Sequence, residues 1–254
     1  MTRTPPGTAL VTGASVGIGE AITRALVADG WRVVAAARRG DRLDALAAEL
    51  GPAVLPWVLD VGDRAAVAAL PAALPAAFAE VDLLVNNAGL ALGREPAQRA
   101  ELDDWETMVQ ANISGLLRCT HALLPGMVAR RRGHVIHIGS VAGHLPYPGG
   151  NVYGASKAFV HQLTMGMKAD LVGTGVRVTV VEPGMVAGSE FSLVRFKGDV
   201  ARAQAQYAGA QAMAPGDIAN AVLWVATQPP HVNVSVLQLM PVDQGPGPIV
   251  LHRG

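Results

Sequence analysis

Seven short runs of apolar and β-branched residues recur along the chain, spaced so that a helix fits between most neighbours. The runs are residues 9–11, 31–37, 53–59, 83–85, 134–138, 176–181 and 234–239. Several are apolar at nearly every position, as expected of strands that are covered on both faces. Strands that alternate with helices favour a parallel sheet. The pattern therefore predicts an α/β fold with a doubly wound parallel sheet and helices on both faces.

The segments between these runs show helical spacing. Ile18, Ile22 and Leu26 mark one face of a first helix, and Gly30 supplies its C-terminal stop. The same period continues over residues 105–127, which predicts one long helix, and recurs over 160–171. No internal repeat or linker is visible, so we expect a single domain over 1–254. The period lapses at about 184–216, which we interpret as a substrate lid over the carboxyl edge of the sheet.

Composition excludes several classes of protein. The 254 residues carry 20 Lys+Arg and 20 Asp+Glu, and half of them are hydrophobic. A net charge of zero gives no global field for a nucleic acid, and the apolar content rules out intrinsic disorder. No continuous apolar stretch is long enough for a membrane span, and no signal-peptide core is visible, so we expect a cytoplasmic protein. Cys119 is the only cysteine, and we expect it to be buried in a helix.

A glycine-rich turn joins the first strand to the first helix. Residues 12–19 read Thr-Gly-Ala-Ser-Val-Gly-Ile-Gly. Glycines at such a turn let backbone N–H groups approach a pyrophosphate at the helix N-terminus. At the end of the second strand stand Arg38 and Arg39, where an acid would select NAD and an arginine would accept the 2′-phosphate of NADP. These two features predict an NADP(H) site.

Polar residues follow three further strands. Asp60 ends the third run, Asn86-Asn87-Ala88-Gly89 follows the fourth, and Ser140 follows the fifth. Thirteen residues after Ser140, Tyr153 and Lys157 are one helical turn apart and share a face. An ammonium beside a phenol favours the phenolate, so Lys157 is expected to lower the pKa of Tyr153 and make it a usable acid and base.

Taken in order and spacing, these motifs resemble the classical short-chain dehydrogenases/reductases over essentially the whole chain. Asn112 in the long helix and Pro183-Gly184 after the sixth strand complete the set. The resemblance implies a Rossmann-type sheet of seven strands and a homotetramer. It also implies catalytic roles: Tyr153 exchanges a proton with the substrate oxygen, Ser140 hydrogen-bonds that oxygen, Lys157 holds the nicotinamide ribose, and Asn112 positions a water that relays protons to Lys157.

Motifs and resemblance together give a set of expected cofactor contacts. They are Gly13, Ser15, Gly17, Ile18, Gly19, Arg38, Arg39, Asp60, Val61, Asn87, Ala88, Gly89, Tyr153, Lys157, Pro183, Gly184, Val186 and Ser189. Within the family, residues 149–157 and 182–191 look like the NADP-dependent 3-hydroxy acid dehydrogenases that act on serine-like acids. The hydroxyl that often follows Pro-Gly-x-Val-x is displaced here to Ser189.

The substrate prediction depends on a carboxylate partner. Expected substrate contacts are Ser140, Tyr147, Tyr153 and Arg195. Arg195 and Lys197 are the two cations of the irregular segment that we consider for the carboxylate of a 3-hydroxy acid, and the planar fork of arginine suits it better. Two alternatives stay open: an NADPH-dependent carbonyl reductase for larger ketones or aldehydes, and a non-catalytic NADP-binding sensor.

Two other chemistries find no support in the sequence. A serine nucleophile elbow needs glycine two residues before Ser140, and that position is Ile138. His134 and His137 are three apart on a strand and face opposite ways, so they cannot share a metal ion. We therefore expect no metal site.

Overall fold

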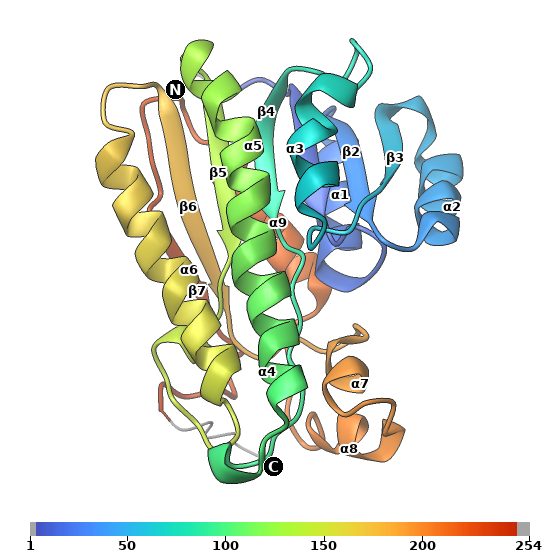
Figure 1. The fold of residues 1–254 in the computed structure, drawn as a ribbon, viewed down its shortest axis with the longest axis vertical. Coiled ribbons are helices and arrows are strands. Elements are labelled where there is room, and N and C mark those ends of the chain that lie inside the picture. Colours follow the sequence, from blue (N-terminus) through green and yellow to red (C-terminus); the bar gives the residue numbers. More distant parts are fainter. Residues whose placement is uncertain (1–3, 248–254) are drawn as a thin grey trace.

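The computed structural model describes residues 4–247 and contains a seven-stranded parallel sheet, which confirms the predicted fold class (Figure 1). The strand order is β3-β2-β1-β4-β5-β6-β7. The strands are β1 (Thr8–Thr12), β2 (Arg32–Ala37), β3 (Val54–Val58), β4 (Val81–Asn86), β5 (Gly133–Ile138), β6 (Val176–Pro183) and β7 (Val236–Leu239). Order reverses at β1 and β4, and this switch point opens a crevice at the carboxyl ends of the strands.

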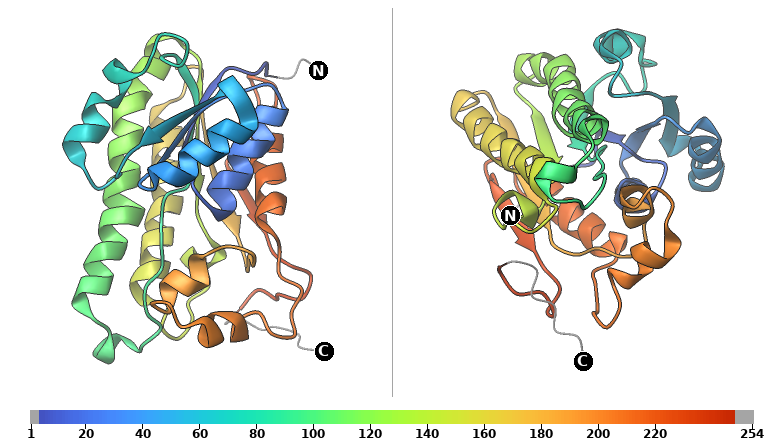
Figure 2. Two further views of the ribbon diagram at one scale, coloured as in Figure 1. Left: turned by 90° about the vertical axis from the view of Figure 1, so that its right-hand side faces the viewer. Right: turned by 60° about the horizontal axis from the view of Figure 1, so that its bottom comes forward.

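Two layers of helices cover the sheet (Figures 1 and 2). One face packs against α1 (Gly17–Ala28), α2 (Gly40–Leu50) and α9 (Pro215–Ala226), and the other against α3 (Arg64–Ala73), α5 (Leu116–Ala129) and α6 (Asn151–Asp170). Strand residues alternate between the two cores. Ala9 and Val11 of β1 face α1 and α9, whereas Leu10 faces the opposite layer. Near-continuous apolar strands are thus explained by burial on both sides.

The long helix expected over 105–127 is interrupted. It consists of α4 (Leu102–Val109), a π-helical stretch (Gln110–Gly115) and α5 in direct succession. Cys119 lies buried in α5, and burial raises the pKa of its thiol to about 12. No helix within 4–247 combines the length and the apolar character that a membrane crossing requires.

The irregular segment contains two short helices, α7 (Phe191–Arg195) and α8 (Val200–Ala205), between β6 and α9. Both lie beyond the carboxyl end of the sheet, near the start of α4 (Figure 1). The backbone N–H of Gly93 donates to the carbonyl of Arg195 over 2.9 Å, so this segment rests on the loop after β4.

Candidate active site

A cavity of about 880 Å³ opens at the carboxyl edge of the sheet. Its walls contain the expected cofactor contacts except Gly19, and the expected catalytic residues except Asn112. Tyr147 and Arg195 line it as well. The sequence motifs therefore meet around one space, although they come from the ends of β1 to β6 and from the segment after β6.

The glycine-rich turn has the backbone that its sequence predicts. Gly13 and Gly17 have φ of +68° and +61°, which favours glycine at both positions. Gly19 serves packing instead of lining the cavity, because an added Cβ would lie 2.2 Å from the carbonyl oxygen of Gly13. The Asn87 side-chain amide donates to the carbonyl of Thr12 over 2.9 Å and ties this turn to the end of β4.

Of the two arginines after β2, Arg39 is the one whose side chain is hydrogen-bonded to the glycine-rich turn. Its guanidinium donates to the Ser15 hydroxyl over 3.1 and 3.3 Å. It also forms an ion pair with Glu190, at 2.6 Å, and Glu190 in turn contacts Arg42 at 2.9 Å. The Arg39 hydrogen bond is the main cause of a lowered Glu190 pKa. Arg38 is exposed and lines the cavity.

Sequence reasoning missed this role of Glu190. The residue lies 151 positions after Arg39, and a glutamate beside an irregular segment carries no local signal. In the fold, the Glu190 carboxylate forms an ion pair with Arg39, one of the two arginines that were expected to bind the 2′-phosphate of NADP. The segment after β6 and the cofactor side of the cavity are therefore linked by an ion pair.

Tyr153, Lys157 and Ser140 surround one corner of the cavity. Lys157 is buried, its ammonium donates to the carbonyl of Ile138 over 2.8 Å, and it lies 5.8 Å from the Tyr153 ring centroid. The Ser140 hydroxyl donates to the carbonyl of Pro183 over 3.3 Å and accepts from the backbone N–H of Ala142. Tyr153 and Lys157 project from the first turns of α6, as their spacing predicts.

The pKa of Tyr153 differs from the expectation. Burial raises it to about 12, whereas a hydrogen bond with Ser140 and the positive charge of Arg195 act in the opposite direction. Burial also lowers the pKa of Lys157 to about 8. The expected lowering by Lys157 is not among the causes of this shift, and the ammonium instead donates to the Ile138 carbonyl.

Asn112 lies behind this corner, in the π-helical stretch. Its amide donates to the carbonyl of Leu90 over 2.9 Å and to the Ser156 hydroxyl over 3.0 Å, and its oxygen accepts from the Leu90 N–H over 2.8 Å. The side chain thus fastens the loop after β4 to α6. It reaches the neighbour of Lys157 rather than the cavity itself.

Arg195 is the cation that enters the cavity, whereas Lys197 does not. Arg195 is 3% exposed and its guanidinium lies 5.7 Å from the Tyr153 ring centroid and 5.4 Å from that of Tyr147. Its donors reach the carbonyls of Gly93 and Gly149, and no ion pair joins it to any residue within 4–247. Lys197 is 57% exposed and pairs with Asp104 at 2.9 Å. Arg195 is the last residue of α7, whereas Lys197 lies beyond the end of the helix with a φ of +53°.

Two further aromatic and cationic groups stand beside Arg195 and were not predicted. Phe191 meets Tyr153 edge to face, with ring centroids 5.7 Å apart. Arg94 lies 5.6 Å from the Tyr147 ring centroid, and burial and the charge of Arg195 lower its pKa. Tyr147 therefore has two guanidinium groups close to its ring. Neither forms an ion pair with a residue within 4–247, so the positive charge at this corner suits a small anion.

The end of β6 closes the cavity on the remaining side. The Gln244 side chain accepts from the Met185 N–H over 2.7 Å and lies so close to Gly184 that an added Cβ would be 2.4 Å from its oxygen. Ser189 stands across from Gly17, where an added Cβ would be 2.8 Å away. The displaced hydroxyl is thus at the cavity wall, beside the glycine-rich turn.

Comparison with known proteins agrees with this geometry. The family model described as short chain dehydrogenase matches residues 7–196. The NADP-dependent 3-hydroxy acid dehydrogenase YdfG of Salmonella typhi is 54% identical over 96% of this chain and 98% of its own. Serine 3-dehydrogenase of Agrobacterium fabrum is 50% identical over 94% of this chain and 95% of its own.

A solved structure extends the agreement to the fold. The closed form of serine dehydrogenase complexed with NADP⁺ superposes with a TM-score of 0.93 at 53% identity, and the match covers 94% of this chain and 96% of that one. On the family match and these identities, together with the meeting of Ser140, Tyr153 and Lys157 in one cavity, the chain belongs to the short-chain dehydrogenase family.

Proposed function

We propose that this protein is an NADP(H)-dependent oxidoreductase that interconverts a small 3-hydroxy acid, such as serine or 3-hydroxypropionate, and its semialdehyde. The observation that carries the proposal is Arg195. It is a buried guanidinium beside Tyr153, with no ion pair within 4–247. A buried charge is costly without a counterion, so a site that places one against the reacting centre is suited to an anionic substrate.

The residues present fit the proposed cofactor. The turn with positive φ at Gly13 and Gly17 leaves no room for side chains at the N-terminus of α1, which suits a pyrophosphate. Arg39 and Ser15 lie together where the 2′-phosphate would bind, and Arg38 is beside them. When bound, the nicotinamide accepts a hydride from the carbinol carbon, or returns one to the carbonyl carbon. The names of the relatives support the same choice.

This chain's own residues would handle the proton. In reduction, the protonated phenol of Tyr153 donates to the substrate oxygen, and its pKa of about 12 in the cofactor-free chain keeps that proton available at neutral pH. In oxidation, the phenolate accepts the proton. Ser140 orients the substrate oxygen, and Lys157 supplies the nearby positive charge that stabilises the phenolate. Asn112 fixes the backbone around Lys157 through Ser156 and Leu90.

The substrate carboxylate would bind between Arg195 and Tyr147. A guanidinium presents parallel donors to a carboxylate, which fixes both its distance and its orientation. Phe191 packs against the Tyr153 ring and limits the space on that side. This arrangement favours short acids over bulky ketones, so the carbonyl reductase alternative receives less support from the cavity.

A substrate panel tests the proposal. Rates of NADP(H)-linked turnover are measured with serine, 3-hydroxypropionate, matched alcohols without a carboxylate, and bulky ketones, each also with NAD(H). We expect the 3-hydroxy acids to have the highest kcat/KM. Turnover restricted to bulky ketones would instead support the carbonyl reductase alternative, and cofactor binding without turnover of any compound would support the sensor.

The proposal also covers the oligomeric state of the protein, its location in the cell and the role of residues 184–216. Trp224 of α9 and Val236 of the edge strand β7 are apolar and exposed, which supports an interface with a second copy, and we expect a homotetramer. Light scattering coupled to size-exclusion chromatography measures the assembly. We also expect a cytoplasmic protein, and a single domain whose residues 184–216 act as a lid.

A further inference from the structure

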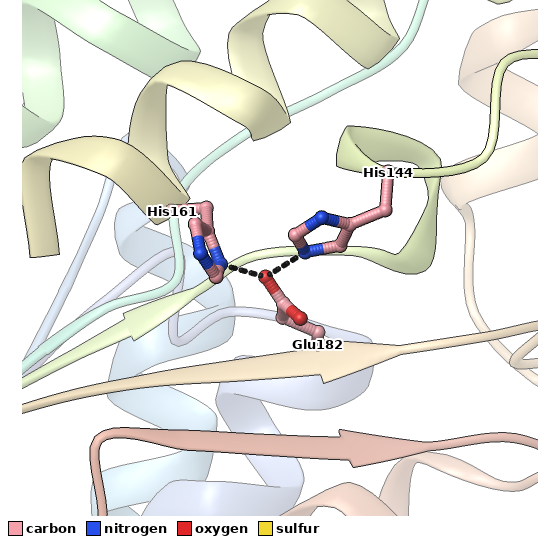
Figure 3. A group of neighbouring side chains, drawn as sticks. All are labelled: His144, His161 and Glu182. Carbon is pink, nitrogen blue, oxygen red and sulfur yellow. Dashed lines mark hydrogen bonds and ion pairs between the residues drawn. The ribbon is translucent and has the colours of Figure 1, made fainter. Parts of the chain in front are cut away.

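Two histidines and a glutamate meet in one cluster (Figure 3). His144 follows the short 3-10 turn after Ser140, His161 lies on α6, and Glu182 is near the end of β6. One carboxylate oxygen of Glu182, Oε1, accepts from Nε2 of His144 over 2.9 Å and from Nδ1 of His161 over 2.8 Å. None of the three residues lines the cavity.

The Glu182 carboxylate is incompletely satisfied. The side chain is 1% exposed, and its second oxygen, Oε2, is buried without a hydrogen-bond partner within residues 4–247. Leaving a buried acceptor without a partner costs free energy, and more for a charged group. Both imidazoles approach Oε1, so Oε2 remains an unused acceptor on a carboxylate that the cluster already orients. This favours a cation over a simple hydrogen-bonded cluster.

We propose that His144, His161 and Glu182 bind a divalent transition metal ion, with Zn²⁺ the ion that their chemistry suits best. Imidazole nitrogen and carboxylate oxygen are preferred ligands of Zn²⁺, at about 2.0–2.2 Å. The three ligand atoms lie within 4.8 Å of one another. Bonds of that length in a tetrahedral site separate ligand atoms by about 3.3 Å, so modest side-chain rotations suffice.

The site has an accessible side. His144 is 36% exposed and His161 25%, so an ion and a water ligand have a path from solvent. In the metal-free cluster, each imidazole uses an N–H toward Oε1. On metal binding, that hydrogen moves to the other ring nitrogen in a neutral imidazole, or leaves to solvent from a protonated one, and the freed lone pair binds the ion.

The proposed ion would join three elements that carry the active site. His144 is four residues after Ser140, His161 is four residues after Lys157, and Glu182 directly precedes Pro183. Because the site lies outside the cavity, the ion does not touch the substrate. Its expected effect is to stabilise the fold around the Ser140 corner. The inference is independent of the proposed dehydrogenase activity.

Sequence reasoning considered a different pair, His134 and His137. In the structure, His134 bonds to Thr179 and His137 to Asn86, and burial lowers the pKa of both imidazoles. The pair that meets Glu182 is separated from it by 38 and 21 residues. The turn after β5, α6 and β6 contribute one residue each, so only the tertiary fold brings these groups together.

Calorimetry with Zn²⁺ tests the site in the chelator-treated full chain at neutral pH. We expect a single Zn²⁺ per chain. Since altering even an outer-shell partner lowers metal affinity by about 10- to 100-fold, His144→Gln and His161→Gln should each weaken binding by at least about 100-fold. His121→Gln, an exposed histidine of α5 outside the cluster, is the matched control and should bind as the wild type does.

Two measurements on the wild-type protein test the proposal even if a variant folds poorly. Co²⁺ bound to the wild type should give the visible absorption of a tetrahedral site, and Zn²⁺ should raise the wild-type Tm, as ligands of the native state do. Absence of Zn²⁺ binding and of the Co²⁺ bands in the wild type would overturn the proposal. Equal affinity in the three variants would do so too, because the ion would then bind elsewhere.

Discussion

The two ends of the cavity are built differently. The cofactor end is made largely of backbone: a turn with positive φ at Gly13 and Gly17, and a helix N-terminus behind it. The substrate end is made of long side chains, chiefly Arg195, Tyr147 and Phe191. A backbone turn needs particular residues at fixed spacing, whereas converging side chains do not. The cofactor end can therefore be recognised from a sequence motif, whereas the sequence offers only candidate residues for the substrate end.

The difference also concerns how each end would change under mutation. Substitutions at the glycine turn meet backbone atoms, such as the Gly13 carbonyl 2.2 Å from a Cβ on Gly19. Substitutions at the substrate end remove single charges or rings and leave the sheet intact. The cofactor end is therefore expected to be rigid and general, and the substrate end to be adjustable.

The largest effect is expected where the two ends meet, at Tyr153. Tyr153→Phe keeps the ring against Phe191 and removes the proton that the proposed mechanism uses. Positioned acid and base groups contribute about 10²- to 10⁴-fold, so kcat should fall by at least about 100-fold. Stopped-flow turnover measures kcat, and fluorescence titration with NADPH measures whether the variant still binds the cofactor. Near-normal turnover in this variant would remove Tyr153 from the mechanism.

A smaller, selective loss is expected for Arg195→Ala. Hydrogen bonds to charged groups contribute about 1.5–3 kcal/mol, which corresponds to about 10- to 100-fold in kcat/KM for a 3-hydroxy acid. Turnover of an uncharged alcohol of similar size should fall much less. Lys197→Ala is the matched control, because Lys197 pairs with Asp104 outside the cavity. Equal losses on acid and alcohol would assign Arg195 to lid packing instead.

At the cofactor end, Arg39→Ala should reduce the preference for NADP(H) over NAD(H). Arg39 is partly exposed, so we take the lower end of the range for a charged hydrogen bond, about tenfold. Arg38→Ala should have a smaller effect, since Arg39 is the residue joined to Ser15. The ratio of kcat/KM for the two cofactors measures this preference. If only Arg38→Ala changed the ratio, the two arginines would have the reverse roles.

The smallest effect is expected at Glu190, whose ion pair with Arg39 links the segment after β6 to the cofactor end of the cavity. Glu190 competes with a 2′-phosphate for Arg39, so Glu190→Gln should bind NADP(H) more tightly. A partly exposed ion pair contributes about 0.2–1 kcal/mol, which corresponds to a gain of at most about fivefold. NAD(H), which has no 2′-phosphate, should bind unchanged. Paired titrations with the two cofactors distinguish this competition from a general loosening of the lid.

Much of the fold was predictable because burial on both faces leaves a plain signal. Strand runs such as 31–37 and 176–181 are apolar at most positions, with Arg32, Arg177 and Thr179 as the exceptions, and β2 and β6 occupy nearly the same residues. The interruption at 110–115 was not predictable, because a π-helical stretch keeps the apolar period on both sides and has no pattern of its own.

The candidate site shows the same division. Tyr153 and Lys157 were found by spacing on one helix, and the structure places them together. The choice between Arg195 and Lys197 required the orientation of α7, since the two residues stand only two apart. Glu190 was not foreseen at all, because its partner Arg39 is reached only through the tertiary fold.

The π-helical stretch has a consequence for insertions and deletions. A π-turn holds more residues than an α-turn, and each residue of an α-helix advances by about 100°. Losing one residue between 110 and 115 would restore α-helical winding and keep α5 close to its present orientation relative to α4, because the wider π-turn already absorbs the extra residue. Cys119, Leu123 and Met127 would then still face the sheet they now cover. The deletion would instead displace Asn112, which bonds to Leu90 and Ser156, whereas the same deletion inside α5 would rotate all that follows it in the helix by about 100°.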